Sequence, residues 1–151
     1  MGHATLPVQI VQAVQVVPMI GIHSLRKTFK TGTDLVQAVD GVDLQVNERE
    51  FFVLLGLSGS GKTTLLRCVA GLERPDAGEI FLGEQMVSSA EEAIFITPED
   101  RAIGMVFQSY AVWPHMTVFE NVAFPLTDGK RKLPRAKVRD RVMGALEMVQ
   151  L

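Results

Sequence analysis

The sequence predicts an α/β fold in which a glycine-rich loop joins a buried strand to a helix. Three observations support this prediction. Short apolar segments typical of strands recur between turn residues over much of the chain. One of them, 51–55, leads into the glycine-rich segment 56–61 and then into helix-forming residues. After Pro134, apolar residues recur at helical spacing, with basic residues on the other face.

The glycine-rich segment fits a phosphate-binding loop. Residues 56–63 read GLSGSGKT and match the pattern G-x-x-x-x-G-K-[ST]. Glycines let the backbone wrap a phosphate without Cβ clashes, and the N-terminus of the following helix presents unpaired N–H groups and the positive end of its dipole. The residues expected to bind the nucleotide here are Gly56, Ser58, Gly59, Ser60, Gly61, Lys62, Thr63 and Thr64.

Two side chains of this loop carry the expected chemistry. The pattern predicts that Lys62 reaches the β- and γ-phosphates, which makes it a catalytic candidate, and that the Thr63 hydroxyl binds Mg²⁺. A glycine-rich turn with an incidental lysine is the alternative interpretation. The strand before the loop and the helix after it favour phosphate binding, because this context places the loop at a helix N-terminus.

Composition and charge narrow the class of protein. The chain has 151 residues, and its 47% apolar and 21% charged residues are ordinary for a globular domain with a real core. One cysteine, Cys68, excludes an internal disulfide framework and is expected to be a packed thiol. Seven of the fifteen basic residues lie in 130–141, where we expect a solvated helical face. No nucleic-acid partner is expected, because the remaining residues are predominantly acidic.

The N-terminal segment resembles a leader only in its lack of charge. Residues 1–25 contain no Asp, Glu, Lys or Arg, but glutamines and prolines interrupt the apolar run and no basic region precedes it. Neither a signal peptide nor a membrane-spanning helix fits this pattern. We therefore expect residues 1–19 to be an N-terminal extension that precedes a first strand near Ile20.

The remaining elements follow from apolar patterns and turn residues. Strands are expected at 20–25, 36–39, 42–46, 51–55, 79–83 and 103–107, with a turn at 31–34. Helices are expected at 64–70, where Gly71 suits the C-cap, at about 117–123, and after Pro134. Residues 84–97 are ambiguous, and no linker is long enough to divide the chain.

The segment after the last expected strand resembles a known family. Residues 105–122, MVFQSYAVWPHMTVFENV, are similar to the Q-loop region of ATP-binding-cassette (ABC) transporter ATPases. Segments 25–29, 38–42 and 72–80 resemble other parts of the same ATPases. The likeness is greatest to importer ATPases for iron(III), polyamines or related solutes. It implies a P-loop NTPase with an N-terminal antiparallel β subdomain. Residues 20–151 would then be a partial nucleotide-binding domain that ends within the helical subdomain.

The resemblance also implies roles for single residues. Phe29 matches the aromatic position that stacks on adenine, and Gln108 matches the glutamine that contacts Mg²⁺ and the attacking water. The implied cofactors are therefore ATP and Mg²⁺, with Lys62 and Gln108 as catalytic residues and Thr63 and Gln108 at the metal. Simple core packing is the alternative interpretation of Phe29.

The implied partners are a membrane permease and a second ATPase subunit. In this family the permease meets the loop 109–119, which begins at Ser109 and ends at Phe119 and contains Tyr110, Trp113 and Met116. The alternative for these side chains is a small satellite core beneath the loop. The implied location is cytoplasmic, at the inner face of the membrane through the permease.

The chain also departs from the family pattern. No Leu-Ser-Gly-Gly-Gln signature follows the Q-loop region, and no apolar strand ends in Asp-Glu. The nearest segment is 93–100, where Pro98 interrupts the strand before Glu99 and Asp100. We expect an ATP-binding part of an ATPase that couples hydrolysis to solute import, truncated before the signature and Walker B motifs and not hydrolysing ATP alone. A non-catalytic fragment and a different P-loop nucleotide kinase are the alternatives.

Overall fold

The computed structural model describes residues 17–109, 111–128 and 132–151 of the chain. It contains two compact units, of which the first ends at Ile103 and the second spans Gly104–Leu151. Most of the expected N-terminal extension, residues 1–16, lies outside the described residues. Residues 17–19 precede the first strand without helix or strand structure, as expected for the end of an extension.

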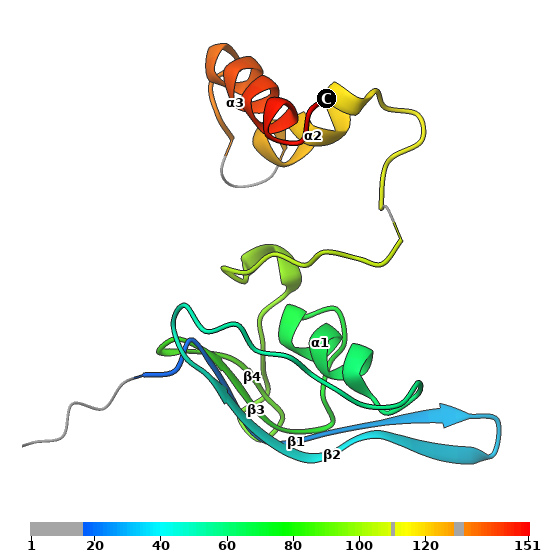
Figure 1. The fold of residues 1–151 in the computed structure, drawn as a ribbon. Coiled ribbons are helices and arrows are strands. Elements are labelled where there is room, and N and C mark those ends of the chain that lie inside the picture. The colour runs from blue at the N-terminus through cyan, green and yellow to red at the C-terminus, as the bar shows by residue number, and fades with distance from the viewer. Residues whose placement is uncertain (1–16, 110, 129–131) are drawn as a thin grey trace, which may run out of the picture. The chain divides into compact units, whose positions relative to one another are not determined.

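The first unit is built on an antiparallel sheet (Figure 1). Its five strands lie in the order β2-β1-β3-β4-β5, and every neighbouring pair is antiparallel. The expectation of an antiparallel β subdomain is therefore confirmed. The strands are β1 (Ile20–Thr31), β2 (Asp34–Val46), β3 (Ala77–Leu82), β4 (Gln85–Ser89) and β5 (Ile94–Phe95). The last two lie within segment 84–97, which was ambiguous from the sequence.

Strands β1 and β2 form a long hairpin. Its turn contains Gly32 at a φ of 63°, within the turn expected at 31–34. The two strands expected at 36–39 and 42–46 are in fact one strand, which is a correction to the sequence prediction. Gly41, at a φ of 64°, is passed over in the pairing between Asp40 and Val42, so a bulge carries the strand through a residue that looked like a break.

Helix α1 (Lys62–Ala70) covers one face of this sheet (Figure 1). It ends as predicted at Gly71, whose φ of 77° lets the backbone turn out of the helix. The helix and the sheet share one core, in which β1, β2, β3, β4 and α1 all contribute buried side chains. These are Ile22, Leu25, Val39, Leu65, Cys68, Val69, Ile80 and Val87.

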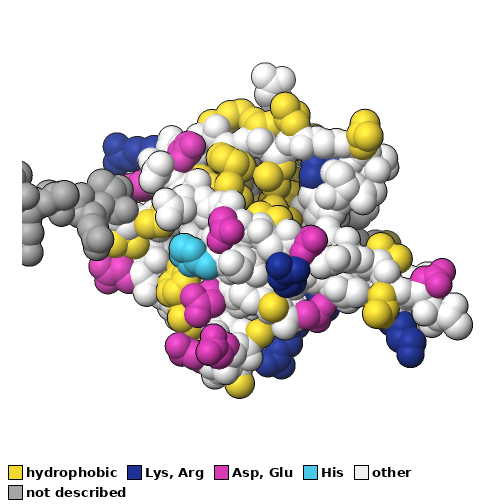
Figure 2. All heavy atoms as spheres, turned by 90° about the horizontal axis from the view of Figure 1, so that it is seen from below, with side chains coloured by type: hydrophobic (Ala, Val, Ile, Leu, Met, Phe, Trp, Pro, Cys, Tyr) yellow, Lys and Arg dark blue, Asp and Glu magenta, His cyan; other side chains and the backbone are white. Residues whose placement is uncertain are grey.

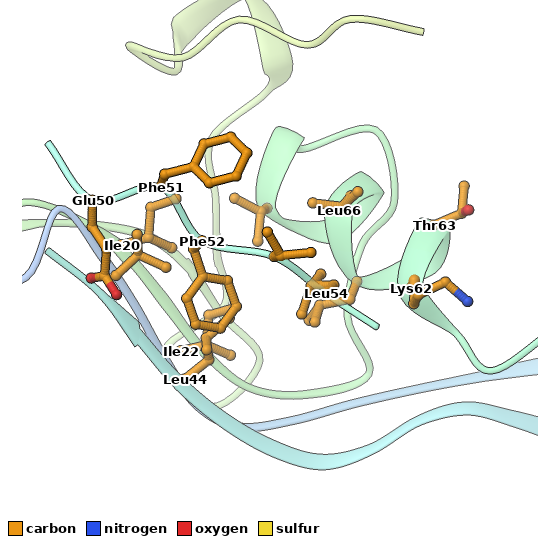
Figure 3. Close-up of a pocket in the computed structure, with 14 residues that line it drawn as sticks. Ile20, Ile22, Leu44, Glu50, Phe51, Phe52, Leu54, Lys62, Thr63 and Leu66 are labelled. Carbon is orange, nitrogen blue, oxygen red and sulfur yellow. The ribbon is translucent and has the colours of Figure 1, made fainter. Parts of the chain in front are cut away.

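The strand predicted at 51–55 is wrong as an assignment. The segment is not part of any ladder in the described sheet, and Phe51 and Leu55 are 92% and 89% exposed. Successive side chains still point to opposite sides, with Phe52 directed toward Ile22 and Leu44 (Figure 3). An apolar sequence can favour extended backbone, but a strand also needs a neighbour to accept and donate its ladder hydrogen bonds.

The buried strand predicted at 103–107 is wrong for the same reason. No residue of this segment is in a strand, and Val106 is 98% exposed. The preceding residues are more regular, since β5 is followed by a short 3₁₀ helix, η1 (Pro98–Asp100). Pro98 is the first residue of η1 and ends the extended backbone, as the sequence suggested.

The second unit is a pair of helices, α2 (Val118–Thr127) and α3 (Arg135–Met148), close to the positions expected. Thr117 and Glu120 form a capping box at the start of α2, and the hydrogen bonds from Thr117 hold the pKa of Glu120 below its usual range. Their small core contains Ala123, Val138 and Val142. Among the described residues, none of the helices is long and apolar enough to cross a membrane.

Candidate nucleotide-binding site

The glycine-rich loop has the backbone geometry that its sequence predicts. Gly59 and Gly61 have φ angles of 80° and 86°, a region that side-chain-bearing residues rarely adopt. A Cβ on Gly61 would overlap the carbonyl oxygen of Ala38 on β2, whereas a Cβ on Gly59 would meet nothing within 4 Å. Gly61 is therefore needed for both its conformation and its close packing, and Gly59 for its conformation alone.

The Lys62 side chain folds back over the loop. Its Nζ donates to the carbonyl oxygens of Gly56 and Leu57 at 2.8 and 2.7 Å and to Ser60 Oγ at 3.1 Å. These bonds place a positive charge inside the curve of the loop, next to the backbone of its first two residues. A charge in this position suits an anion that the loop encloses.

The N-terminus of α1 completes this anion site. Gly61 occupies the N-cap position, so no side chain caps the helix, and its first turn carries no acidic residue. The N–H groups of that turn and the positive end of the dipole are therefore directed to the loop side. Lys62 and Thr63 project from this first turn (Figure 3), and Thr63 is exposed. The donor set fits a phosphate group, and the Thr63 hydroxyl fits a hard cation bound to it.

An apolar groove lies beside the loop rather than in it. It has a volume of about 660 Å³ and lies among β1, β2, segment 50–54 and α1. Its walls include Ile22, Leu44 and Phe52, which point into it (Figure 3). Most of the lining is apolar, but Lys62 and Thr63 in the first turn of α1 also line the groove, so the groove and the anion site share these two residues.

Phe29, the expected adenine contact, lies on β1 and is 36% exposed. The ammonium group of Lys27 sits 5.2 Å from its ring centroid. Glu73 and Asp76 hold Lys27 in place at 3.0 and 3.3 Å. Burial opposes the charge on Lys27, but its bonds to these carboxylates outweigh that effect and raise its pKa. The ring of Phe29 is therefore partly exposed to solvent and contacts Lys27, and it is not a core residue.

Cys68 and Arg101 lie at the other end of α1. Cys68 is fully buried, and burial raises the pKa of its thiol to about 11, so it is the packed thiol that the sequence indicated. Arg101 is only 5% exposed and donates from Nη1 to the carbonyl oxygens of Cys68 and Val69 at 2.8 and 2.6 Å. Burial lowers the pKa of Arg101, although a guanidinium remains charged at neutral pH.

Gln108 lies in the second unit and is exposed. The expected metal site joins Gln108 to Thr63 of the first unit, and this pairing stays a prediction. Within the described residues, no group of three or more His, Cys, Asp and Glu side chains could hold a metal ion.

The loop 109–119 is held by a residue that the sequence did not single out. Asn121 accepts from Trp113 N at 2.7 Å and donates to the carbonyl oxygens of Trp113, Met116 and Thr117 at 3.0–3.1 Å. Trp113 and Phe119 are 49% and 38% exposed and do not belong to the buried cluster of α2 and α3. Tyr110 lies outside the described residues.

The surface charge is mixed. On the face shown in Figure 2, acidic and basic side chains are interspersed, and apolar side chains also reach the surface. The basic residues of 130–141 that are described carry a local ion pair between Lys132 and Asp128 at 3.8 Å. Lys130 and Arg131 lie outside the described residues. This distribution agrees with a solvated helical face, as expected from the sequence.

The loop, its lysine and its helix define a P-loop nucleotide-binding protein, and the comparisons identify the family. The ABC transporter family model matches residues 39–151, which is most of the chain. The chain therefore belongs to the ABC transporter family.

Its relatives are ATP-binding subunits of importers. The chain is 51% identical over 116 residues to the trehalose/maltose import ATP-binding protein MalK of Thermococcus litoralis, covering 77% of this chain and 31% of that protein. It is 44% identical over 137 residues to the spermidine/putrescine import ATP-binding protein PotA of Thermobifida fusca, covering 91% and 34%. The chain thus spans about a third of the length of these relatives.

Solved structures agree on the fold. A dimeric ATP-binding cassette in a post-hydrolysis state, bound to ADP and Pi, matches with a TM-score of 0.74 and 30% identity, covering 88% of this chain and 58% of that one. A second dimeric structure, of a bacterial ABC transporter cassette, matches with a TM-score of 0.71 at the same identity and coverage. The predicted fold class and the resemblance to importer ATPases are both confirmed.

Proposed function

We propose that this chain binds MgATP as part of the ATPase subunit of an importer, in which ATP hydrolysis is coupled to movement of a solute across a membrane. The observation that carries the proposal is the phosphate loop, where Lys62 lies inside a turn of glycine backbone at an uncapped helix N-terminus. Residues 20–151 then form part of a nucleotide-binding domain. The names of the relatives, which are import ATP-binding proteins, support this assignment.

Each predicted site residue has a role in this proposal. The backbone of Gly56, Ser58, Gly59, Ser60 and Gly61 surrounds the phosphates, with Lys62 as the main countercharge and Thr64 in the first turn of the helix. Thr63 and Gln108 bind Mg²⁺, and Gln108 also contacts the attacking water. Phe29 stacks on adenine, for which its partly open ring and fixed position on β1 are suitable.

The same proposal assigns partners. The exposed side chains of loop 109–119, Trp113 and Phe119 among them, form the contact with a permease, because Asn121 fixes the loop and leaves these apolar groups outside the helical core. The dimeric state of the matched cassettes supports a second ATPase subunit as a partner. Binding to a permease would place the subunit at the cytoplasmic face of the membrane.

The direct test is equilibrium binding of a fluorescent ATP analogue with Mg²⁺ to the 151-residue chain and to Lys62→Ala. Removing the ammonium group removes the main countercharge, so we expect an affinity loss of about tenfold or more. Lys137→Ala is the matched control, because it deletes an exposed lysine of the second unit and changes the net charge equally. In a full-length subunit, Lys62→Ala should also abolish MgATP hydrolysis. Unchanged binding by Lys62→Ala would overturn the proposal.

A further inference from the structure

Arg101 is a buried cation at the end of α1 that lies away from the phosphate loop. Its guanidinium donates to carbonyl oxygens from separate parts of the first unit. Nη1 bonds Cys68 and Val69 at the C-terminus of α1, Nε bonds Ile96 at 2.8 Å, and Nη2 approaches Val87 of β4 at 3.4 Å. One side chain therefore connects the helix to β4 and to the segment after β5.

The groups around Arg101 fit its guanidinium in shape and in charge. Its guanidinium lies over the Phe95 ring, 5.3 Å from the centroid. On the helix side, a Cβ on Gly71 would approach Arg101 Nε to 2.5 Å, so the glycine that ends α1 also leaves the space that the arginine fills. Its hydrogen-bond partners are carbonyl oxygens, two of which form the negative end of the α1 dipole.

Resting on the proposed nucleotide-binding function, we infer that Arg101 is a positioning residue for the phosphate loop. Helix α1 connects Arg101 to the phosphate loop. Its first residue is Lys62, and its last turn contributes the carbonyl oxygens of Cys68 and Val69 that Arg101 binds. A helix of this length is a stiff rod, so fixing its C-terminus to β4 and segment 94–101 also fixes the direction of its N-terminus.

Two physical effects follow from this position. The first is geometric, because a tilt of α1 would move the N–H groups of its first turn relative to the glycine loop, which is held on β2 by Gly61 and Ala38. The second is electrostatic. The charge of Arg101 compensates the negative end of the α1 dipole inside the unit, which leaves the positive end of the dipole to act on an anion in the loop. The buried positive charge of Arg101 also adds to the positive electrostatic potential at the loop.

The experiment compares the 151-residue chain with Arg101→Met and Arg101→Lys. Methionine keeps the length of the side chain but removes the charge and all its donors. Lysine keeps the charge but cannot reach three groups of carbonyls with a planar fork. Arg74→Met is the matched control, because Arg74 is exposed and lies over the same Phe95 ring at 5.5 Å. Affinities for MgATP and for inorganic tripolyphosphate are measured at a temperature where circular dichroism shows each variant to be folded.

We expect Arg101→Met to bind both ligands about fivefold to tenfold more weakly, Arg101→Lys to lie between it and the unchanged chain, and Arg74→Met to match the unchanged chain. Equal losses for MgATP and tripolyphosphate would support an effect on the phosphate loop. A lower melting temperature with unchanged affinity in the folded protein would overturn the inference, because a merely structural arginine behaves that way. If Arg101→Met does not fold, unchanged affinity of Arg101→Lys is the result that overturns it.

Lys62→Ala, measured in parallel, separates this inference from the proposed function. If Lys62→Ala loses affinity while both Arg101 variants keep theirs, only the role of Arg101 is wrong. If Lys62→Ala binds like the unchanged chain, the proposed nucleotide site fails, and the inference about Arg101 fails with it.

Discussion

The backbone of Gly61 packs directly against the carbonyl oxygen of Ala38, so the last glycine of the phosphate loop contacts strand β2. This contact ties the loop to the β hairpin. Gly59 is different, since its Cβ position is open although its φ of 80° is just as unusual. A side chain at Gly59 would therefore cost free energy through backbone conformation alone, whereas a side chain at Gly61 would also clash with β2.

Gly61→Ala should be distinctly more harmful than Gly59→Ala. Both substitutions place a side chain in left-handed backbone, at a cost of roughly 1–2 kcal/mol. Only Gly61→Ala also forces the loop away from Ala38, so we expect a larger fall in the free energy of unfolding and a greater loss of MgATP affinity. Urea denaturation and nucleotide binding measure the two effects. Equal behaviour of the two variants would show that contact with β2 does not matter.

The features that the sequence predicted well are those encoded by neighbouring residues. The turn at Gly32 and the C-cap at Gly71 each depend on residues a few positions apart. The phosphate loop is local in the same sense. Segment 51–55 shows the limit, because its apolar residues indicate extended backbone but contain no information on whether another strand pairs with it.

Residues that act over long sequence distances were missed. Arg101 follows the acidic turn residues Glu99 and Asp100 and looks like a surface arginine, yet its bond to Cys68 spans 33 positions. The ammonium group of Lys27 likewise donates a hydrogen bond to Asp76, which is 49 positions away. Neither position has a local pattern that reveals burial or a partner. Only the pairing of β1 with β3 and the packing of α1 bring these groups together.

Phe29→Ala should weaken ATP binding by roughly 1–3 kcal/mol, the range found for stacking of a base on an aromatic side chain. Phe29→Trp should preserve the affinity, because it keeps a flat ring beside Lys27. Val36→Ala is the matched control, since Val36 is the exposed cross-strand partner of Phe29 on β2. Isothermal titration with MgATP provides the dissociation constants. An alanine variant with an unchanged constant would return Phe29 to a purely structural role.

Cys68 should make the protein less stable as the pH rises above about 9. The folded thiol has its pKa raised from 9.0 to about 11, chiefly by burial. Between these values the unfolded chain releases the thiol proton while the folded chain keeps it, so the unfolded state binds fewer protons and stability falls with pH. Urea denaturation from pH 8 to 11 should show this slope, and Cys68→Ala should show less of it.

The same burial predicts slow thiol chemistry. At pH 8, a thiol reagent such as Ellman's reagent should modify Cys68 slowly in the folded chain and rapidly in concentrated urea, because reaction requires an accessible thiolate. Fast modification of the folded chain, at a rate close to that in urea, would show that α1 opens readily.

The 151-residue chain should bind MgATP without hydrolysing it. Phosphoryl transfer needs Mg²⁺ held from two sides and a group that orients water, and the loop supplies only the phosphate contacts, Lys62 and Thr63. The nearest acidic residues after an apolar segment are Glu99 and Asp100, which lie in the 3₁₀ helix η1 that Pro98 begins and not at the end of a long strand. Phosphate release is measured from purified chain with MgATP, with Lys62→Ala as the background control. Release clearly above that background would mean that a carboxylate of this chain orients water, and Glu99→Gln and Asp100→Asn would then identify which one.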